Sequence, residues 1–109
     1  MVQRLFAARR RLPPGAFLCG LRSDDPAMRG VSRVWRYAVS WIDGDRLVYG
    51  RKRLSLRLED PTPREDGTVR DGFLVWAARD ETTGACCDIA VGARDAYKLL
   101  QSPLANSPR

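Results

Sequence analysis

The adjacent thiols of Cys86 and Cys87 are the side chains most able to do covalent chemistry in this sequence, and Cys19 is the third cysteine. The three could form a redox switch or a thiolate metal site. Neighbouring strand residues point to opposite faces, however, and three thiolates lack the fourth ligand that structural zinc prefers. We interpret them as small buried apolar residues in a reduced, metal-free protein, because an odd cysteine count without framework spacing favours a reducing compartment.

Histidine is absent from all 109 residues. Serine–histidine and cysteine–histidine nucleophilic pairs, histidine proton shuttles and most catalytic zinc sites need that side chain. The sequence also lacks a P-loop, a G-x-G-x-x-G fingerprint and a G-x-S-x-G elbow, the usual signatures of phosphate cradling, dinucleotide binding and α/β-hydrolase chemistry. We therefore expect no enzymatic activity, no cofactor and no small-molecule substrate.

Arginine supplies most of the positive charge, with seventeen Arg among nineteen cations and a formal net charge of +6. Guanidinium forks suit phosphate and carboxylate recognition, although codon bias in a GC-rich genome gives the same excess. Residues 1–57 carry thirteen cations against four acids, whereas residues 58–109 carry six against nine. This asymmetry indicates an acidic partner, with a merely solvated basic face as the alternative. The candidate residues for binding an anionic partner are Arg9, Arg10, Arg11, Arg33, Arg36, Arg51, Lys52 and Arg53.

Three aromatic residues, Trp35, Tyr37 and Trp41, lie at odd positions of one segment, with Arg33 and Arg36 beside them. They could form a stacking platform for nucleic-acid bases. Aromatic residues at a period of two are more often the core-facing side of a half-buried strand. We favour the core interpretation.

The alternation of residue types predicts the strands that position these side chains. Residues 15–22 read GAFLCGLR and form a first strand. Residues 35–42 and 46–50 form a hairpin around Asp43-Gly44, a pair that suits a tight turn with positive φ at both central positions.

Further strands follow in the second half of the chain. Residues 54–59 alternate leucines with polar side chains and form a fourth strand. Residues 60–72 contain two prolines and many charges, which predicts a polar loop. Residues 72–80 and 85–91 then form a second hairpin joined by residues 81–84.

The spacing of the apolar residues changes near the C-terminus from that of a strand to that of a helix. Ala93, Ala96, Tyr97 and Leu100 have the spacing of one helical face, and Pro103 should end that helix. Six short strands in meander order followed by one helix describe a mainly β (α+β) fold: a small antiparallel roll or partly open barrel, with the helix covering one open end or face.

These elements also divide the chain. We expect a basic N-terminal arm at residues 1–14, a single β-rich domain at residues 15–101 and a flexible tail at residues 102–109. No stretch approaches the length of a transmembrane helix, and the basic N-terminus lacks the apolar region of a signal peptide.

Several stretches of the sequence resemble the actinobacterial domain of unknown function 2550 family. The arginine run RRRL, the strand GAFLCGLR, the stretch W-R-Y-A-V-x-W-x-D-G-D-R-L-x-Y and the segment R-L-S-L-R carry the resemblance. The matching positions are Gly15, Phe17, Cys19, Leu21, Arg22, Trp35, Gly44, Asp45, Arg46 and Leu47. The resemblance covers residues 9–57 and, more loosely, residues 85–101.

The resemblance implies a pleckstrin-homology-like (PH-like) fold at the cytoplasmic face of the membrane, and no activity. This chain departs from the family pattern in two ways. We expect no membrane anchor before the arginine run, and the segment after the fourth strand is short.

Two classes of function agree with these observations. The first is a non-catalytic binding or scaffold module, acting at an anionic membrane surface or with an acidic protein partner. The second is a basic nucleic-acid-binding domain. The expected location is cytoplasmic and peripheral to the inner membrane face, where arginines add roughly 1 kcal/mol each to binding of anionic lipid.

Overall fold

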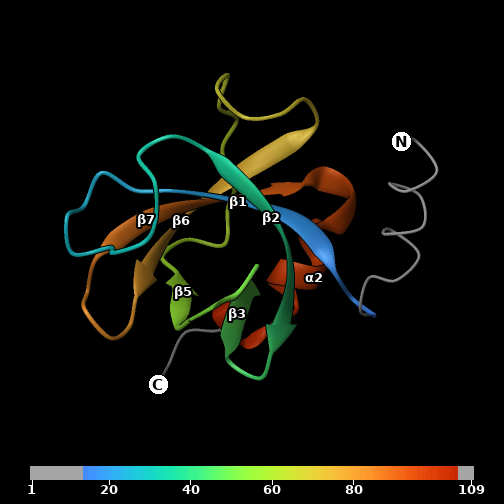
Figure 1. Cartoon of the computed structure of the whole chain (residues 1–109). Helices are drawn as coiled ribbons and strands as arrows, with labels where there is room; N and C mark the ends of the chain where they lie inside the picture. Colours follow the sequence, from blue (N-terminus) through green and yellow to red (C-terminus); the bar gives the residue numbers. More distant parts are fainter. Residues whose placement is uncertain (1–13, 106–109) are drawn as a thin grey trace, which may run out of the picture.

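A seven-stranded antiparallel sheet curls into a barrel in the computed structural model, which describes residues 14–105 (Figure 1). The strands are β1 (Phe17–Arg22), β2 (Arg36–Asp43), β3 (Arg46–Tyr49), β4 (Lys52–Leu54), β5 (Leu56–Leu58), β6 (Phe73–Asp80) and β7 (Cys86–Gly92). Their order in the sheet is β4-β3-β2-β1-β7-β6-β5, so β1 pairs with β7 and joins the first strand to the last. The predicted antiparallel meander, in the form of a nearly closed barrel, is confirmed.

The barrel closes through a bend in the chain at Ser55. The fourth predicted strand is split there into β4, which pairs with β3, and β5, which pairs with β6. The backbone N–H of Glu81 donates to the carbonyl of Ser55 at 2.8 Å and holds the bend. The two edge strands of the sheet, β4 and β5, are therefore consecutive in sequence. The predicted alternation holds through the bend, since Leu56 and Leu58 are buried.

The barrel interior is filled by alternate residues of its strands. The largest fully buried side chain is Trp76 on β6, whose indole N–H donates to the carbonyl of Pro61 at 3.1 Å. Other buried members of this core are Phe17, Cys19, Leu21, Leu47, Leu56, Ala78, Cys87, Ile89 and Val91. The satisfied indole matters because a buried donor without a partner costs about 1–3 kcal/mol.

The side of β2 that faces the core is the opposite of the one predicted. The inward-facing residues of β1 pair with Ser40, Ala38 and, at the exposed end of β2, Arg36. Tyr37 instead pairs with Gly20, and the aromatic side of the strand lies on the outer face of the barrel. The interior already holds the rings of Trp76 and Phe17, and so small a barrel leaves little space for three more aromatic side chains. The core interpretation of the aromatic stripe is therefore wrong.

The β2–β3 hairpin is confirmed, but its turn is displaced by one residue. Asp43 pairs with Arg46, so the two loop residues are Gly44 and Asp45. Gly44 has a φ of +63°, whereas among the described residues no amino acid other than glycine has a positive φ. Glycine with positive φ at the first central position is the pattern of a type II′ turn rather than the type I′ turn expected.

The predicted C-terminal helix is divided into short helical pieces, and the chain beyond residue 101 is part of the domain. The pieces are η1 (Ala93–Asp95), α2 (Ala96–Leu100) and, after a break, η2 (Pro103–Ala105). The buried residues are Leu99 and Leu104, while Tyr97 and Leu100 of the predicted face are exposed. The predicted tail therefore begins too early, because Leu104 enters the core. No helix within residues 14–105 is long and apolar enough to cross a membrane.

Because Leu104 is buried, its substitution should destabilise the protein strongly, although the sequence analysis assigned this residue to a flexible tail. Leu104→Ala should lower the free energy of unfolding by about 2–5 kcal/mol, because it leaves a cavity against β5. Leu100→Ala is the matched control and should cost about 0.5 kcal/mol or less, since Leu100 is 37% exposed. Urea unfolding followed by circular dichroism measures both. Equal, small effects would show that η2 does not dock.

Candidate binding surface

The long loop between β5 and β6 crosses the outer face of the barrel. Arg64 forms an antiparallel bridge with Val75 on β6, and further along the loop Thr68 reaches Trp35 beside β2. The loop therefore spans β6, β7 and β1. Val75 and Ala90, which lie on the outer face, are fully buried beneath it. The sequence predicted a polar loop here, but not that it covers the sheet.

An ion-pair cluster fixes this loop to β1 and β7. Arg22 on β1 bonds Asp66 of the loop at 3.0 Å and Asp88 of β7 at 3.2 Å. Arg64 lies 3.2 Å from the same Asp88 and 3.8 Å from Asp66. Together with Thr68, these four side chains make up what we call the loop clamp. Two guanidinium groups thus share two carboxylates across three separate segments.

Thr68 uses its whole hydrogen-bonding capacity in the clamp. Its hydroxyl accepts from Nε1 of Trp35 at 2.9 Å and from Nη1 of Arg22 at 3.0 Å, and it donates to Asp66 at 2.5 Å. A hydroxyl has one donor and two acceptor positions, and all three are occupied in Thr68. The indole, the guanidinium and the carboxylate therefore have fixed relative positions.

The loop clamp shifts the pKa values of Asp66 and Arg22. Hydrogen bonds from the hydroxyl and the backbone N–H of Thr68, with help from Arg22, lower the pKa of Asp66 to about 2. Partial burial opposes the charge on Arg22, but bonds to Asp88 and Asp66 outweigh it and raise the pKa of that guanidinium. Both groups are therefore charged at neutral pH.

Aromatic rings and guanidinium groups are layered next to the clamp. Tyr37 lies so close to Gly20 that a Cβ at that glycine would be 2.8 Å from its ring. The guanidinium of Arg22 lies 4.4 Å from the ring centre of Trp35. Arg70 lies 5.6 Å from the centre of Tyr37, and its backbone N–H donates to the tyrosine hydroxyl at 3.0 Å. These contacts hold the rings on the outer face.

Between the loop before β2 and the loop before β6 lies an open groove of about 560 Å³. We call it the arginine groove. Its lining residues are Arg22, Arg33, Val34, Trp35, Tyr37, Thr68, Val69 and Arg70. Three of these are cations, and none of the described residues that line it is acidic. Its electrostatic character is therefore that of an anion site.

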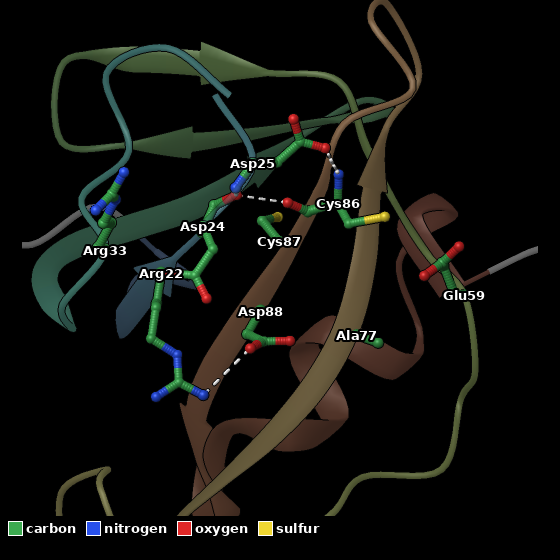
Figure 2. Close-up of a pocket in the computed structure, with 10 residues that line it drawn as sticks. Arg22, Asp24, Asp25, Arg33, Glu59, Ala77, Cys86, Cys87 and Asp88 are labelled. Atoms are coloured by element: carbon green, nitrogen blue, oxygen red, sulfur yellow. Dashed lines mark hydrogen bonds and ion pairs between the residues drawn. The ribbon is translucent and has the colours of Figure 1, made fainter. Parts of the chain in front are cut away.

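A second cleft, of about 370 Å³, lies around the start of β7 (Figure 2). Four acids line it together with two arginines, so its charge is mixed: the acids are Asp24, Asp25, Glu59 and Asp88. Figure 2 shows Arg22 bonded to Asp88 on one side and the backbone of Cys86 bonded to Asp25 on the other. The internal pairing makes this cleft the weaker candidate for an anionic ligand.

The three cysteines have different environments. Cys19 and Cys87 are buried, as predicted, and Cys87 faces the core. Burial raises the pKa of Cys19 well above its ordinary value and that of Cys87 to about 12, so both are poor nucleophiles. Cys86 is exposed, which corrects the expectation that all three are buried apolar residues. Because adjacent strand residues alternate, only one of the pair can face inward.

Four of the five predicted cations that the structure describes lie toward one rim of the barrel. The side chain of Lys52 lies against Gly30, and the hydroxyl of Tyr49 donates to the carbonyl of Arg36 at 2.6 Å. These contacts bring the β1–β2 loop, the start of β2 and the β3–β4 turn side by side. We define the basic rim as Arg29, Arg33, Arg36, Arg51 and Lys52. Within residues 14–105, none of the five forms an ion pair.

The other predicted cations do not join the rim. Arg53 points to the opposite face of β4 from Lys52 and pairs with Asp43 near the hairpin tip, at 2.7 Å. Arg9, Arg10 and Arg11 lie outside the described residues, so their part in binding an anionic partner stays a prediction. The sequence reasoning also missed Arg29 and Arg70. Only the path of their loops brings them to the rim and the arginine groove.

Comparison with known proteins returns no matching family model, no matching curated protein and no matching solved structure. The resemblance to the actinobacterial family rests on the quoted residues and stays a prediction. The geometry of the basic rim and the arginine groove is therefore the basis for assigning a function.

The lowered pKa of Asp66 predicts an acid-sensitive clamp. The carboxylate is favoured in the folded state, so its stabilisation is present above its ordinary pKa and is lost as the pH falls from about 4 towards about 2. Asp66→Asn should therefore lower stability at pH 7, and its deficit relative to wild type should shrink over that interval. Urea midpoints measured across the pH series test this. A deficit that stays constant with pH would assign the effect to the amide rather than to the lost charge.

Proposed function

We propose that this protein is a non-catalytic binding module whose basic rim docks on an anionic membrane surface. One observation carries the proposal: cations from three separate segments lie on one rim without carboxylate partners among the described residues. Elsewhere, arginines such as Arg57 and Arg79 pair with glutamates. Cations left unpaired on one rim produce the positive field that attracts anionic lipid.

The rim also presents an apolar side chain. Val34 is 59% exposed and lies between Arg33 and Arg36, next to the half-buried Trp35. An exposed apolar residue flanked by cations suits the membrane interface, because it can enter the headgroup layer while the guanidinium groups contact phosphates. This arrangement favours lipid over a purely polar protein partner.

Nucleic acid is the second candidate, and the corrected position of the aromatic residues favours it. Trp35 and Tyr37 lie on the outer face and line a groove that contains arginines. Half-exposed rings beside guanidinium groups can stack on unpaired bases, at about 1–3 kcal/mol per base. Salt-titrated binding to single-stranded DNA and RNA discriminates the two functions when it is measured beside vesicle binding.

Vesicle sedimentation tests the membrane proposal. The protein should bind phosphatidylcholine vesicles that contain phosphatidylserine and ignore pure phosphatidylcholine. The double variant Arg36→Gln with Lys52→Gln should bind about 30-fold more weakly at low salt, taking about 1 kcal/mol per cation. Its stability should change little, because exposed unpaired cations contribute little to folding.

The matched control removes the same charge from the other end of the barrel. Arg46 is at the β2–β3 hairpin tip and Arg94 follows β7, both exposed and unpaired among the described residues. Arg46→Gln with Arg94→Gln should keep most of the vesicle affinity. Equal losses in both variants would mean that net charge alone drives binding. Wild-type protein that ignores anionic vesicles but binds single strands would replace the membrane proposal with the nucleic-acid one.

A further inference from the structure

We infer that the arginine groove is a binding site for a phosphomonoester group, presented on a lipid headgroup or on a small soluble molecule. Only the lipid form of this inference rests on the proposed membrane function, because a soluble phosphomonoester needs no membrane. It assigns a defined ligand chemistry to one place, whereas the basic rim provides only a diffuse attraction.

Two guanidinium groups without carboxylate partners among the described residues line the groove, and they come from different loops. Arg33 comes from the loop before β2 and Arg70 from the loop before β6. Neither has a carboxylate within salt-bridge distance in the described part of the chain. Arg22, the third arginine of the lining, is already neutralised by Asp66 and Asp88. An anion in the groove therefore gains two charge-assisted partners without breaking the loop clamp.

Arg70 is held in place before any ligand arrives. Its guanidinium lies 5.6 Å from the ring centre of Tyr37 and 5.9 Å from that of Phe73, and the two rings meet edge to face at 90°. Its backbone is fixed by the bond to the tyrosine hydroxyl. A guanidinium packed on aromatic rings loses little freedom on binding, which favours affinity.

The charge count favours a monoester over a diester. A phosphomonoester carries roughly −1.5 to −2 charges at pH 7 and three terminal acceptor oxygens, which suits two guanidinium forks. A phosphodiester carries one charge on two oxygens and leaves one fork unmatched. The remaining lining of Val34, Trp35 and Val69 gives the groove an apolar side that can contact the carbon skeleton bearing the phosphate.

Amide chemical shifts locate the site with soluble probes. Titration of the wild-type protein with glycerol 3-phosphate and with inorganic phosphate should shift the amides of residues 33–37 and 67–71 and leave those of the hairpin tip unchanged. Arg70→Gln and Arg33→Gln should each weaken the binding of glycerol 3-phosphate by at least about tenfold, as expected for a charge-assisted hydrogen bond. Arg94→Gln is the control and should bind like wild type.

Vesicles separate the lipid source from the soluble one. At matched surface charge, wild type should prefer phosphatidic acid, a phosphomonoester lipid, over phosphatidylserine. Arg70→Gln should lose that preference and keep its phosphatidylserine binding, whereas the Arg36→Gln, Lys52→Gln variant should lose affinity for both and keep the preference.

The outcomes distinguish this inference from the membrane proposal. Binding of glycerol 3-phosphate in the groove without any vesicle binding would support the phosphomonoester site and contradict the membrane function. Vesicle binding with no phosphatidic acid preference, together with soluble-probe shifts that are absent or spread evenly over the basic rim, would overturn the site. The spectra of the variants show at the same time whether each one is folded.

Discussion

One threonine hydroxyl and the guanidinium of Arg22 hold together three parts of this protein that are far apart in sequence. Thr68 binds the indole of Trp35, the guanidinium of Arg22 and the carboxylate of Asp66 with its full hydrogen-bonding capacity. Arg22 extends the network to β7 through Asp88. If this contact did not form, the β5–β6 loop would have no charged anchor on β1, and one wall of the arginine groove would lose its support.

Charge is compensated in some regions of the surface and uncompensated in others. Four of the nine acids in residues 58–109 pair with arginines, and they are Glu59, Asp66, Glu81 and Asp88. The cations of the basic rim have no such partners among the described residues. A sequence with an uneven charge balance thus becomes a barrel in which the loop clamp is compensated, whereas within the described part of the chain the basic rim and single arginines such as Arg70 are not. The uncompensated part is the one that can recognise an anion, because its charges are not already paired.

Local patterns predicted much of this fold. Period-two alternation and turn residues located the strands and both hairpins, because strand formation and turn conformation depend on residues that are neighbours in sequence. The orientation of β2 was not predictable in that way, since alternation does not say which side faces inward. That choice depends on the indole of Trp76, which lies in a distant strand. The isolated Gly20 was the local signal of close approach by another group, here the ring of Tyr37.

The candidate site was less predictable than the fold. Arg33, Arg36, Arg51 and Lys52 stood out by charge alone, and the structure brings them to one rim. Arg70 did not stand out, because its position depends on a polar loop whose path is set by contacts with residues more than thirty positions away in sequence. Loop composition indicates exposure but not which surface the loop will cover.

Amide hydrogen exchange in wild type and in Arg22→Gln tests most directly whether the clamp holds the loop on the barrel. The backbone N–H of Arg64 bonds the carbonyl of Val75 at 2.8 Å and should be protected in wild type. In Arg22→Gln the Arg64 amide should exchange much faster, while the Ala90 and Val91 amides of β7 keep their protection. Unchanged protection of Arg64 in the variant, or an Arg64 amide that exchanges in wild type as fast as in an unfolded chain, would contradict the clamp.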